Sequence, residues 1–270
     1  MPKSRRRSGS RLGRAAAALA GAALLGLAGC AAPRAKSAGP APTPGEVYLA
    51  LLGHNPGLKM MRAVAEARIS FSGRTVSFPG VLQLDVLDGF RLELLDPLDR
   101  PVAIVFSEGG RIVQFRPGQR LAASLGVFPG ECRGVDAADW VGLVSASSVG
   151  PVSGVGLLDR GLWGGERSLE LRRGGDLRQS IRYRDEGGAL QPRLASWYCD
   201  EEPVLQARLG EWLQGAGWRL PTRIELDYVK AGLTVRIDLR EIEANPPPTG
   251  QPLRPRLGSD IGWTSWNLPR

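Results

Sequence analysis

The stretch VLQLDVLDGFRLELL (residues 81–95) decides the fold class, because apolar side chains recur at every second position. The turn dipeptide Asp88-Gly89 divides it into two halves and is a strong signal for a tight hairpin. A two-residue period places apolar side chains on one face of an extended strand and polar ones on the other. The stretch therefore predicts a β-hairpin with one water-facing side. Its inward positions are Leu82, Leu84, Val86, Phe90, Leu92 and Leu94.

The same period continues along most of the chain. Further strands are expected at 102–106, 111–116, 168–172, 177–184, 193–198, 223–228 and 233–242. The inward positions singled out in them are Ile181, Tyr183, Val235, Ile237 and Leu239. Residues 204–213 fit either a strand or a helix, and the neighbouring strands favour a strand.

A few segments depart from this pattern. Residues 46–52 have helical spacing, and 60–64 could continue a helix before an extended segment near 67–72. A helix is expected near 137–144, with Asp136 as its N-cap. The glycine- and serine-rich residues 147–165 predict a loop, and the tail, residues 246–270, reads as proline-rich and irregular.

Together these segments predict an α+β, mainly β fold with about nine to eleven antiparallel strands and short helices. An apolar sheet face must be closed or covered. Because few helices are expected to cover it, the sequence favours a curved, open half-barrel around an apolar cavity. The half-barrel domain is expected over 46–245.

The positive charge of the chain lies mainly at its start. The formal net charge is +8, but residues 1–29 contain six Lys or Arg and no acidic residue. Without them, 29 basic residues stand against 27 acidic ones, which argues against a nucleic-acid binder. Basic residues followed by the apolar run 15–27 are typical of a signal peptide, because thirteen residues cannot span a bilayer.

The signal peptide is expected over 1–29 and ends in LAGC (residues 27–30), which resembles the bacterial lipoprotein processing box. This resemblance implies cleavage before Cys30 and acylation of that cysteine, and the alternative is an ordinary thiol. The next residue is Ala31. An aspartate at this position often favours retention in the inner membrane, so the alanine favours the outer membrane as the location of the protein. Residues 30–45 then read as a lipid-anchored flexible tether.

The remaining cysteines, Cys132 and Cys199, could form a disulfide in an exported protein, but the sequence cannot show that they meet. His54 is the only histidine, and the sequence has no CxxC or Cys/His cluster, so no metal site and no cofactor are expected. A GxSxG motif and a phosphate-binding glycine pattern are also lacking, so the chain is not expected to be an enzyme.

Two segments resemble LolB, the family of outer-membrane lipoprotein receptors that insert lipoproteins. They are FRLELLDPLDRPVAIV (residues 90–105) and GWRLPTRIELDYVKAGLTVRIDLREIEAN (residues 217–245). The resemblance implies an open half-barrel with lid helices whose cavity takes the acyl chains of lipoproteins. A soluble LolA-like carrier in the periplasm would be the partner, and the protein would act at the outer membrane as a monomer.

The family also has an apolar residue on a protruding hairpin loop that is implicated in membrane insertion. The matching position is Leu98, although this chain has Asp99 where the family commonly has glycine. The inward residues named above would form the ligand-binding cavity, and simple core packing is the alternative for each of them. The second functional hypothesis is an envelope lipoprotein with the same fold that binds another lipid or a protein.

Overall fold

The computed structural model describes residues 42–53, 55–119, 121–125, 137–146, 156–247, 252–255 and 262–265. Residues Pro42–Arg270 form one compact unit with its own hydrophobic core. The first meander of strands comprises β1 (Met60–Phe71), β2 (Arg74–Asp85), β3 (Gly89–Leu95), β4 (Pro101–Glu108), β5 (Arg111–Phe115) and β6 (Leu121–Leu125). The second comprises β7 (Gly156–Gly161), β8 (Glu166–Arg173), β9 (Asp176–Glu186), β10 (Ala189–Cys199), β11 (Glu202–Gly215), β12 (Trp218–Tyr228) and β13 (Leu233–Ala244).

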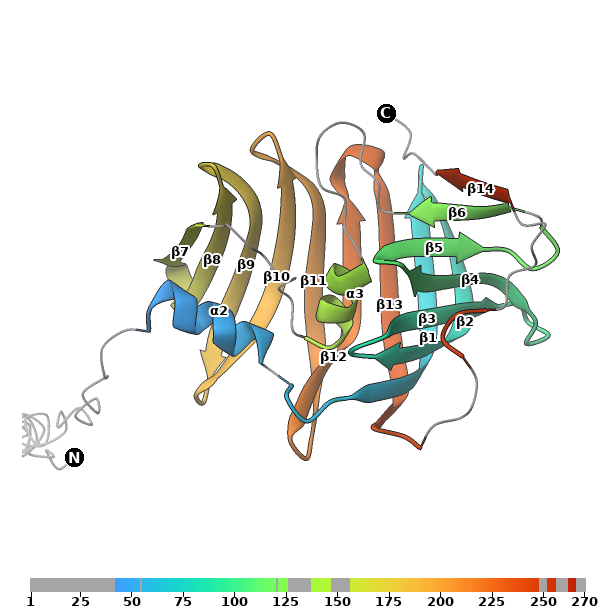
Figure 1. Ribbon diagram of the computed structural model, residues 1–270, viewed down its shortest axis with the longest axis horizontal. Coiled ribbons are helices and arrows are strands. Elements are labelled where there is room, and N and C mark those ends of the chain that lie inside the picture. The colour runs from blue at the N-terminus through green and yellow to red at the C-terminus, as the bar shows by residue number, and fades with distance from the viewer. Residues whose placement is uncertain are drawn as a thin grey trace, which may run out of the picture. The chain divides into compact units, whose positions relative to one another are not determined.

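The strands form a single sheet in the order β14-β6-β5-β4-β3-β2-β1-β13-β12-β11-β10-β9-β8-β7, where β14 is Gly262–Ser265. The first strand of the first meander pairs antiparallel with the last strand of the second, so that Ala67 faces Ile237 and Phe71 faces Leu233. β14 adds in parallel to β6. Because β7 and β14 are edge strands that do not pair with each other, the sheet is curved but open (Figure 1).

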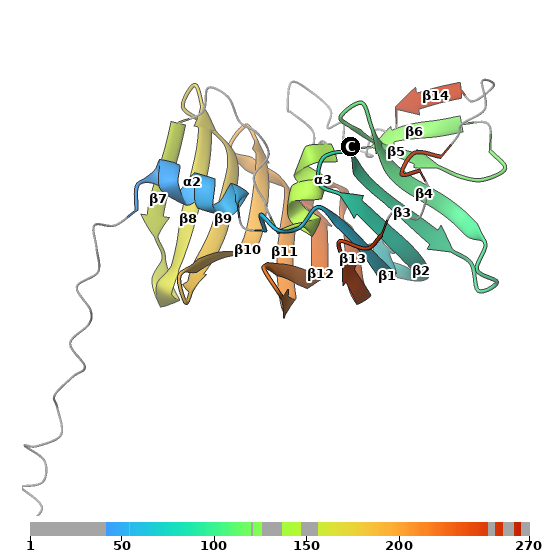
Figure 2. The ribbon, with the colours of Figure 1, turned by 60° about the horizontal axis from the view of Figure 1, so that its bottom comes forward.

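Two short helices lie on the same face of the sheet, which we call the concave face (Figure 2). Helix α2 (Pro44–Leu52) packs against β7, β8 and β10, and helix α3 (Ala137–Val144) packs against β3 and β12. Helix α2 begins with a capping box in which Thr43 and Glu46 satisfy each other's backbone N–H groups. Its apolar side, Val47 and Leu51, is buried against the strands.

The opposite, convex face carries charged side chains in cross-strand ion pairs. Asp238 of β13 accepts a hydrogen bond from Arg223 Nε of β12 at 2.9 Å and two from Arg236, at 2.9 and 3.0 Å. Burial alone would raise the pKa of Asp238, but the hydrogen bonds from Arg236 and Arg223 outweigh it, so that the pKa is lowered. On β12 and β13 the alternation therefore produces one charged face and one apolar face, as residues 81–95 predicted, whereas on β4 and β5 the convex face carries a second apolar cluster of Ile104, Phe106 and Val113.

The predicted fold class, an open and curved antiparallel sheet with short helices, is confirmed, and 204–213 form a strand as favoured. The predicted strand count was too low, because the sheet has fourteen strands. The predicted loop 147–165 contains β7, and the tail described as irregular contains β14. Asp136, the predicted N-cap, lies outside the described residues.

The prediction that a helix continues through 60–64 was wrong, because these residues begin β1. Alanine favours helices in isolation, which hid the alternation of Met61, Ala63, Ala65 and Ala67. In the protein, β1 is paired with β2 on one side and with β13 on the other. Hydrogen bonding along both edges of a strand outweighs the helix preference of alanine, which is roughly a few tenths of a kcal/mol per residue.

Candidate functional site

An apolar cavity of about 510 Å³ lies on the concave face, where the two meanders meet. All of its lining residues are apolar or aromatic, except Gln114 and Arg116. Its volume falls within the roughly 300–1,000 Å³ typical of small-molecule sites. The lining residues are Ala67, Ile69, Phe71, Leu92, Leu94, Val105, Ile112, Gln114, Arg116, Trp140, Leu226, Tyr228, Ala231, Leu233, Val235 and Ile237.

The strand register explains why these residues share one wall. Ile69 pairs with Val235, and Val235 pairs with Leu226 on the other side of β13. Partners that lie directly opposite each other in antiparallel strands point to the same face. The side chains at every second position of β1, β12 and β13 therefore form continuous rows across the junction.

The mouth of the cavity lies at the end of the sheet where β1 ends and β13 begins. Phe71 is 46% exposed, and Val229, in the 3-10 turn Val229–Ala231 between β12 and β13, is 43% exposed. Burial raises the pKa of the Tyr228 hydroxyl to about 12, so this lining residue is uncharged near neutral pH. This part of the rim is thus apolar and reachable from solvent, and the exposed Arg116 adds one positive charge to the lining.

Helix α3 covers the inner end of the cavity, where the Trp140 ring stacks on Phe90 with 5.5 Å between ring centroids. Asn55 fixes the end of this helix. Its side-chain amide donates to the carbonyls of Ser145 and Arg219, and its side-chain oxygen accepts from the Arg219 N–H at 2.7 Å. One buried amide thereby ties the segment before β1 to both α3 and β12.

The structure brings some of the predicted cavity residues together and separates others. Leu92, Leu94, Val235 and Ile237 line the apolar cavity. The others face the core or a second cavity. Four of them are buried on the same face without lining the cavity: Leu82, Leu84, Phe90 and Leu239. Val86 lines the second cavity described below. Ile181 and Tyr183 are buried in the core formed by β8 and β9.

Sequence reasoning missed all of the β1 contribution and all of the α3 contribution. Ala67, Ile69 and Phe71 follow the same two-residue period as Met61 and Ala63, and that period was the available signal. Nothing in the sequence of 137–144 indicated which strands the Trp140 ring would meet. The residues at the 3-10 turn were missed because a turn has no period to follow.

Leu98 lies in the β3–β4 turn and is 70% exposed. Asp96 shapes this turn, because its carboxylate accepts hydrogen bonds from the Leu98 N–H at 2.8 Å and from the Arg100 N–H at 3.0 Å. The side-chain hydrogen bond from Arg100 also lowers the pKa of Asp96. Asp99 adopts φ 57°, the left-handed conformation that a glycine would take there without strain.

The Leu98 turn follows the end of β3, where Leu94 faces Gly80 of β2 and Gly80 faces Ala65 of β1, so the turn begins at a level of the sheet about six residues before Phe71. Cys30 and Cys132 lie outside the described residues. Cys199 takes part in a disulfide, and its pairing with Cys132 stays a prediction. Among the described residues, no His, Cys, Asp and Glu side chains group to hold a metal ion, and no helix there has the length and apolarity to cross a membrane.

No family model matches the sequence, and no relative among curated proteins matches it. Several solved structures resemble the fold, including three that match most of this chain. A LolA superfamily protein from Nitrosomonas europaea is 13% identical, with a TM-score of 0.51, and the match covers 78% of this chain and 97% of that one. A domain from Vibrio parahaemolyticus assigned to outer-membrane lipoprotein sorting is 11% identical, with a TM-score of 0.53 and coverages of 77% and 92%.

A DUF1329 family protein from Desulfovibrio piger is 13% identical, with a TM-score of 0.51, and the match covers 73% of this chain and 91% of that one. Identities this low carry information about the fold and not about the activity. The three matches extend over 73–78% of this chain. The fold of this chain is thus similar to that of a LolA superfamily protein and of a lipoprotein-sorting domain.

Proposed function

We propose that this chain is a lipid-anchored envelope protein that holds an acyl chain of a lipoprotein in the apolar cavity and helps to insert the lipoprotein into the outer membrane. The observation that carries the proposal is the apolar cavity itself, which is covered by α3 and bordered by exposed apolar residues. We infer a binding role rather than a catalytic one.

The chemistry of the lining suits a hydrocarbon chain. Each buried methylene contributes about 0.8 kcal/mol, which is about fourfold in affinity, and no hydrogen bond is needed. Gln114 and Arg116 are the two polar side chains of the lining. An acyl chain would therefore contact apolar groups along most of its length.

The sequence supports the envelope part of the proposal. Acylated Cys30 would hold the protein at a membrane, and residues 30–45 would let the domain move beside it. Ala31 supports the outer membrane as its place. One of the structural relatives is assigned to outer-membrane lipoprotein sorting, which makes a soluble LolA-like carrier in the periplasm the expected donor. We expect the protein to act as a monomer.

Leu98 is the proposed insertion residue. It is exposed at the tip of the β3–β4 turn, which the hydrogen bonds of Asp96 with Leu98 and Arg100 hold in shape. A leucine side chain at this place can enter a bilayer surface while the cavity releases its cargo nearby. The geometry of the turn does not depend on the Leu98 side chain, because the hydrogen bonds of Asp96 reach only its backbone.

A transfer assay tests the proposal. A lipoprotein bound to its soluble carrier is mixed with the full lipidated chain in vesicles, and arrival of the lipoprotein in the vesicles is measured. We expect transfer with the wild type, and loss of transfer with Leu98→Glu while the melting temperature is unchanged. Leu87→Glu is the matched control, since Leu87 is 95% exposed in the turn at the opposite end of the sheet. Equal transfer by both variants would remove the Leu98 role, and no transfer by the wild type would remove the proposed function.

A second candidate is an envelope lipoprotein that binds a different lipid or acts as a scaffold. Arg116 favours the lipid version, because it places a positive charge in the lining of the cavity. Its charge could meet an anionic lipid headgroup at the mouth. Mass spectrometry of lipids that co-purify with the full chain separates the candidates, since a phospholipid in place of lipoprotein acyl chains would favour this one.

A further inference from the structure

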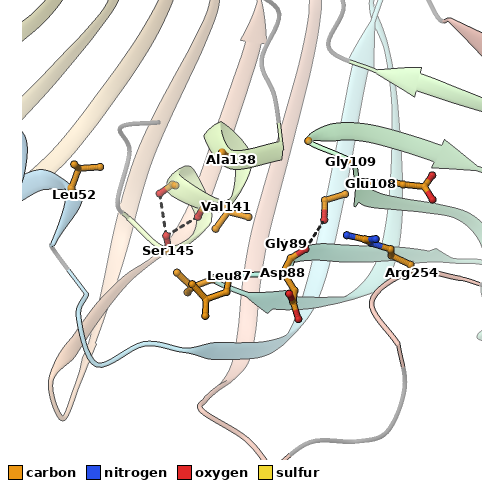
Figure 3. Close-up of a pocket in the computed structure, with 14 residues that line it drawn as sticks. Leu52, Leu87, Asp88, Gly89, Glu108, Gly109, Ala138, Val141, Ser145 and Arg254 are labelled. Atoms are coloured by element: carbon orange, nitrogen blue, oxygen red, sulfur yellow. Dashed lines mark hydrogen bonds between the residues drawn. The ribbon is translucent and has the colours of Figure 1, made fainter. Parts of the chain in front are cut away.

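Helix α3 borders both the apolar cavity and a second cavity of about 410 Å³ on the concave face. The second cavity lies between α3, the β2–β3 turn and the β4–β5 turn (Figure 3). No residue lines both cavities. Unlike the apolar cavity, the second one is lined partly by charged side chains, including Asp88, Glu108 and Arg254.

Phe90 and Trp140 lie between the two cavities. Their rings are stacked at 5.5 Å between centroids with 20° between planes, and both side chains are buried, at 1% and 8% exposure. Trp140 lines the apolar cavity, whereas the next residue of the helix, Val141, lines the second one. Phe90 lines neither, because the stack covers it.

The strand register places the boundary between the two cavities at the level of the Phe90–Trp140 stack. Ser107 of β4 pairs directly with Ile112 of β5, and Ser107 lines the second cavity while Ile112 lines the apolar one. On β3, Gly89 lines the second cavity and Leu92 lines the apolar cavity, with Phe90 between them. The two cavities therefore approach each other on both sides of the stack.

We infer that the Phe90–Trp140 stack is the end wall of the acyl-binding site, and that Trp140 sets the longest chain that the cavity accepts. The inference rests on the proposed function. An acyl chain that enters at Phe71 with its methyl end leading would extend inward along the sheet until it meets this wall. Phe71 is the last residue of β1 and Trp140 lies on α3, which packs against β3, so chain length would be measured between these two lining residues.

The wall can act as a limit because protein interiors are close-packed and yield little to an added methylene. Up to the wall, each methylene strengthens binding about fourfold, which corresponds to about 0.8 kcal/mol. Beyond the wall, further methylenes stay outside the cavity and add little. Removal of the indole would join the two cavities and let a longer chain continue past Phe90.

The experiment uses residues 42–270, which form a compact unit with their own core. Saturated fatty acids from octanoic to stearic acid displace a fluorescent fatty acid, and the affinity gain per methylene is plotted against chain length. We expect the wild type to gain about fourfold per methylene and then to stop at one length. With Trp140→Ala, chains longer than that length should again gain about fourfold per methylene.

A second variant and a control keep the result decisive. Val105→Phe adds bulk beside Leu92 at the inner end of the cavity and should move the stop to shorter chains. Trp197→Ala removes an equally buried indole, at 6% exposure, that lines neither cavity, and should leave the stop unmoved.

The outcomes separate the two proposals. If the wild type binds acyl chains and neither Trp140→Ala nor Val105→Phe moves the stop, the end-wall inference is overturned and the proposed function stands. The same holds if the wild type shows no stop at all. If the wild type binds no fatty acid of any length, the proposed function is overturned, and the end wall with it.

Discussion

Replacing Ala67 with leucine tests whether the apolar cavity is empty space or ordinary core. Ala67 lies on β1 between Phe78 and Ile237, and its methyl group lines the cavity. In an empty cavity, the three added carbons of Ala67→Leu would find room. We therefore expect the free energy of unfolding to stay within about 0.5 kcal/mol of the wild type or to rise.

Ala63→Leu is the matched comparison. Ala63 lies on the same strand and the same face, it is buried, and it does not line the cavity. Three extra carbons in a filled core force neighbours out of their rotamers and cost about 1–3 kcal/mol. The comparison therefore tests whether empty space lies next to the alanine side chain, as it does at Ala67 and not at Ala63.

The affinity for a fatty acid should fall with Ala67→Leu, the variant that keeps its stability, and should change less with Ala63→Leu. Three carbons of leucine in the cavity displace about three methylenes of a bound chain, which is about 2.4 kcal/mol or roughly 60-fold in affinity. Urea unfolding of both variants and displacement of a fluorescent fatty acid provide the two measurements. If Ala67→Leu is destabilised as much as Ala63→Leu, the cavity is packed and the reasoning fails.

Three further predictions concern the parts that hold the site. Asn55→Ala should lower the free energy of unfolding by about 2–3 kcal/mol in urea, because carbonyl and N–H groups of two separate elements lose a buried partner. The pKa of Asp238 is lower in the folded protein than in the unfolded chain, so ionised Asp238 stabilises the fold above the unfolded pKa, and this stability is lost as the pH falls through the folded pKa. Asp238→Asn should therefore reduce the difference between the urea midpoints measured at neutral and at acidic pH. Gly89→Ala should lower the melting temperature strongly, since φ at Gly89 is 118° and an added Cβ would lie 1.7 Å from Ser107 Oγ; a free-energy loss of about 2 kcal/mol or more is expected, and a change below about 0.5 kcal/mol would contradict the geometry.

The fold class could be predicted because a sheet with two different faces has a two-residue period that is visible in any one strand. Residues 81–95 show it, and the structure pairs Leu84 with Phe90 and Leu82 with Leu92 as a hairpin requires. What could not be predicted is the partner of β1. Its pairing with β13 joins residues about 170 positions apart, and no local pattern specifies a partner at such a separation.

The candidate site was predictable only in part, for a different physical reason. A period identifies the face that a side chain points to, and it does not show whether another side chain fills the space above it. Leu82 and Leu92 are cross-strand partners with the same pattern, yet only Leu92 borders the cavity. The deciding element is α3, which covers one part of the concave face and leaves the other open.

The alanines of β1 connect the fold to the proposed function. Ala63, Ala65 and Ala67 occupy three successive inward positions at the centre of the sheet, where larger side chains would bury more apolar surface and add stability. Small side chains at the centre of a curved sheet leave room above it, and the cavity lies above Ala67 and not above Ala63. A chain that was selected for stability alone would fill this space, and real proteins break such packing rules mainly at functional sites. Core packing thus does not explain the space above Ala67, whereas binding of an acyl chain would explain it.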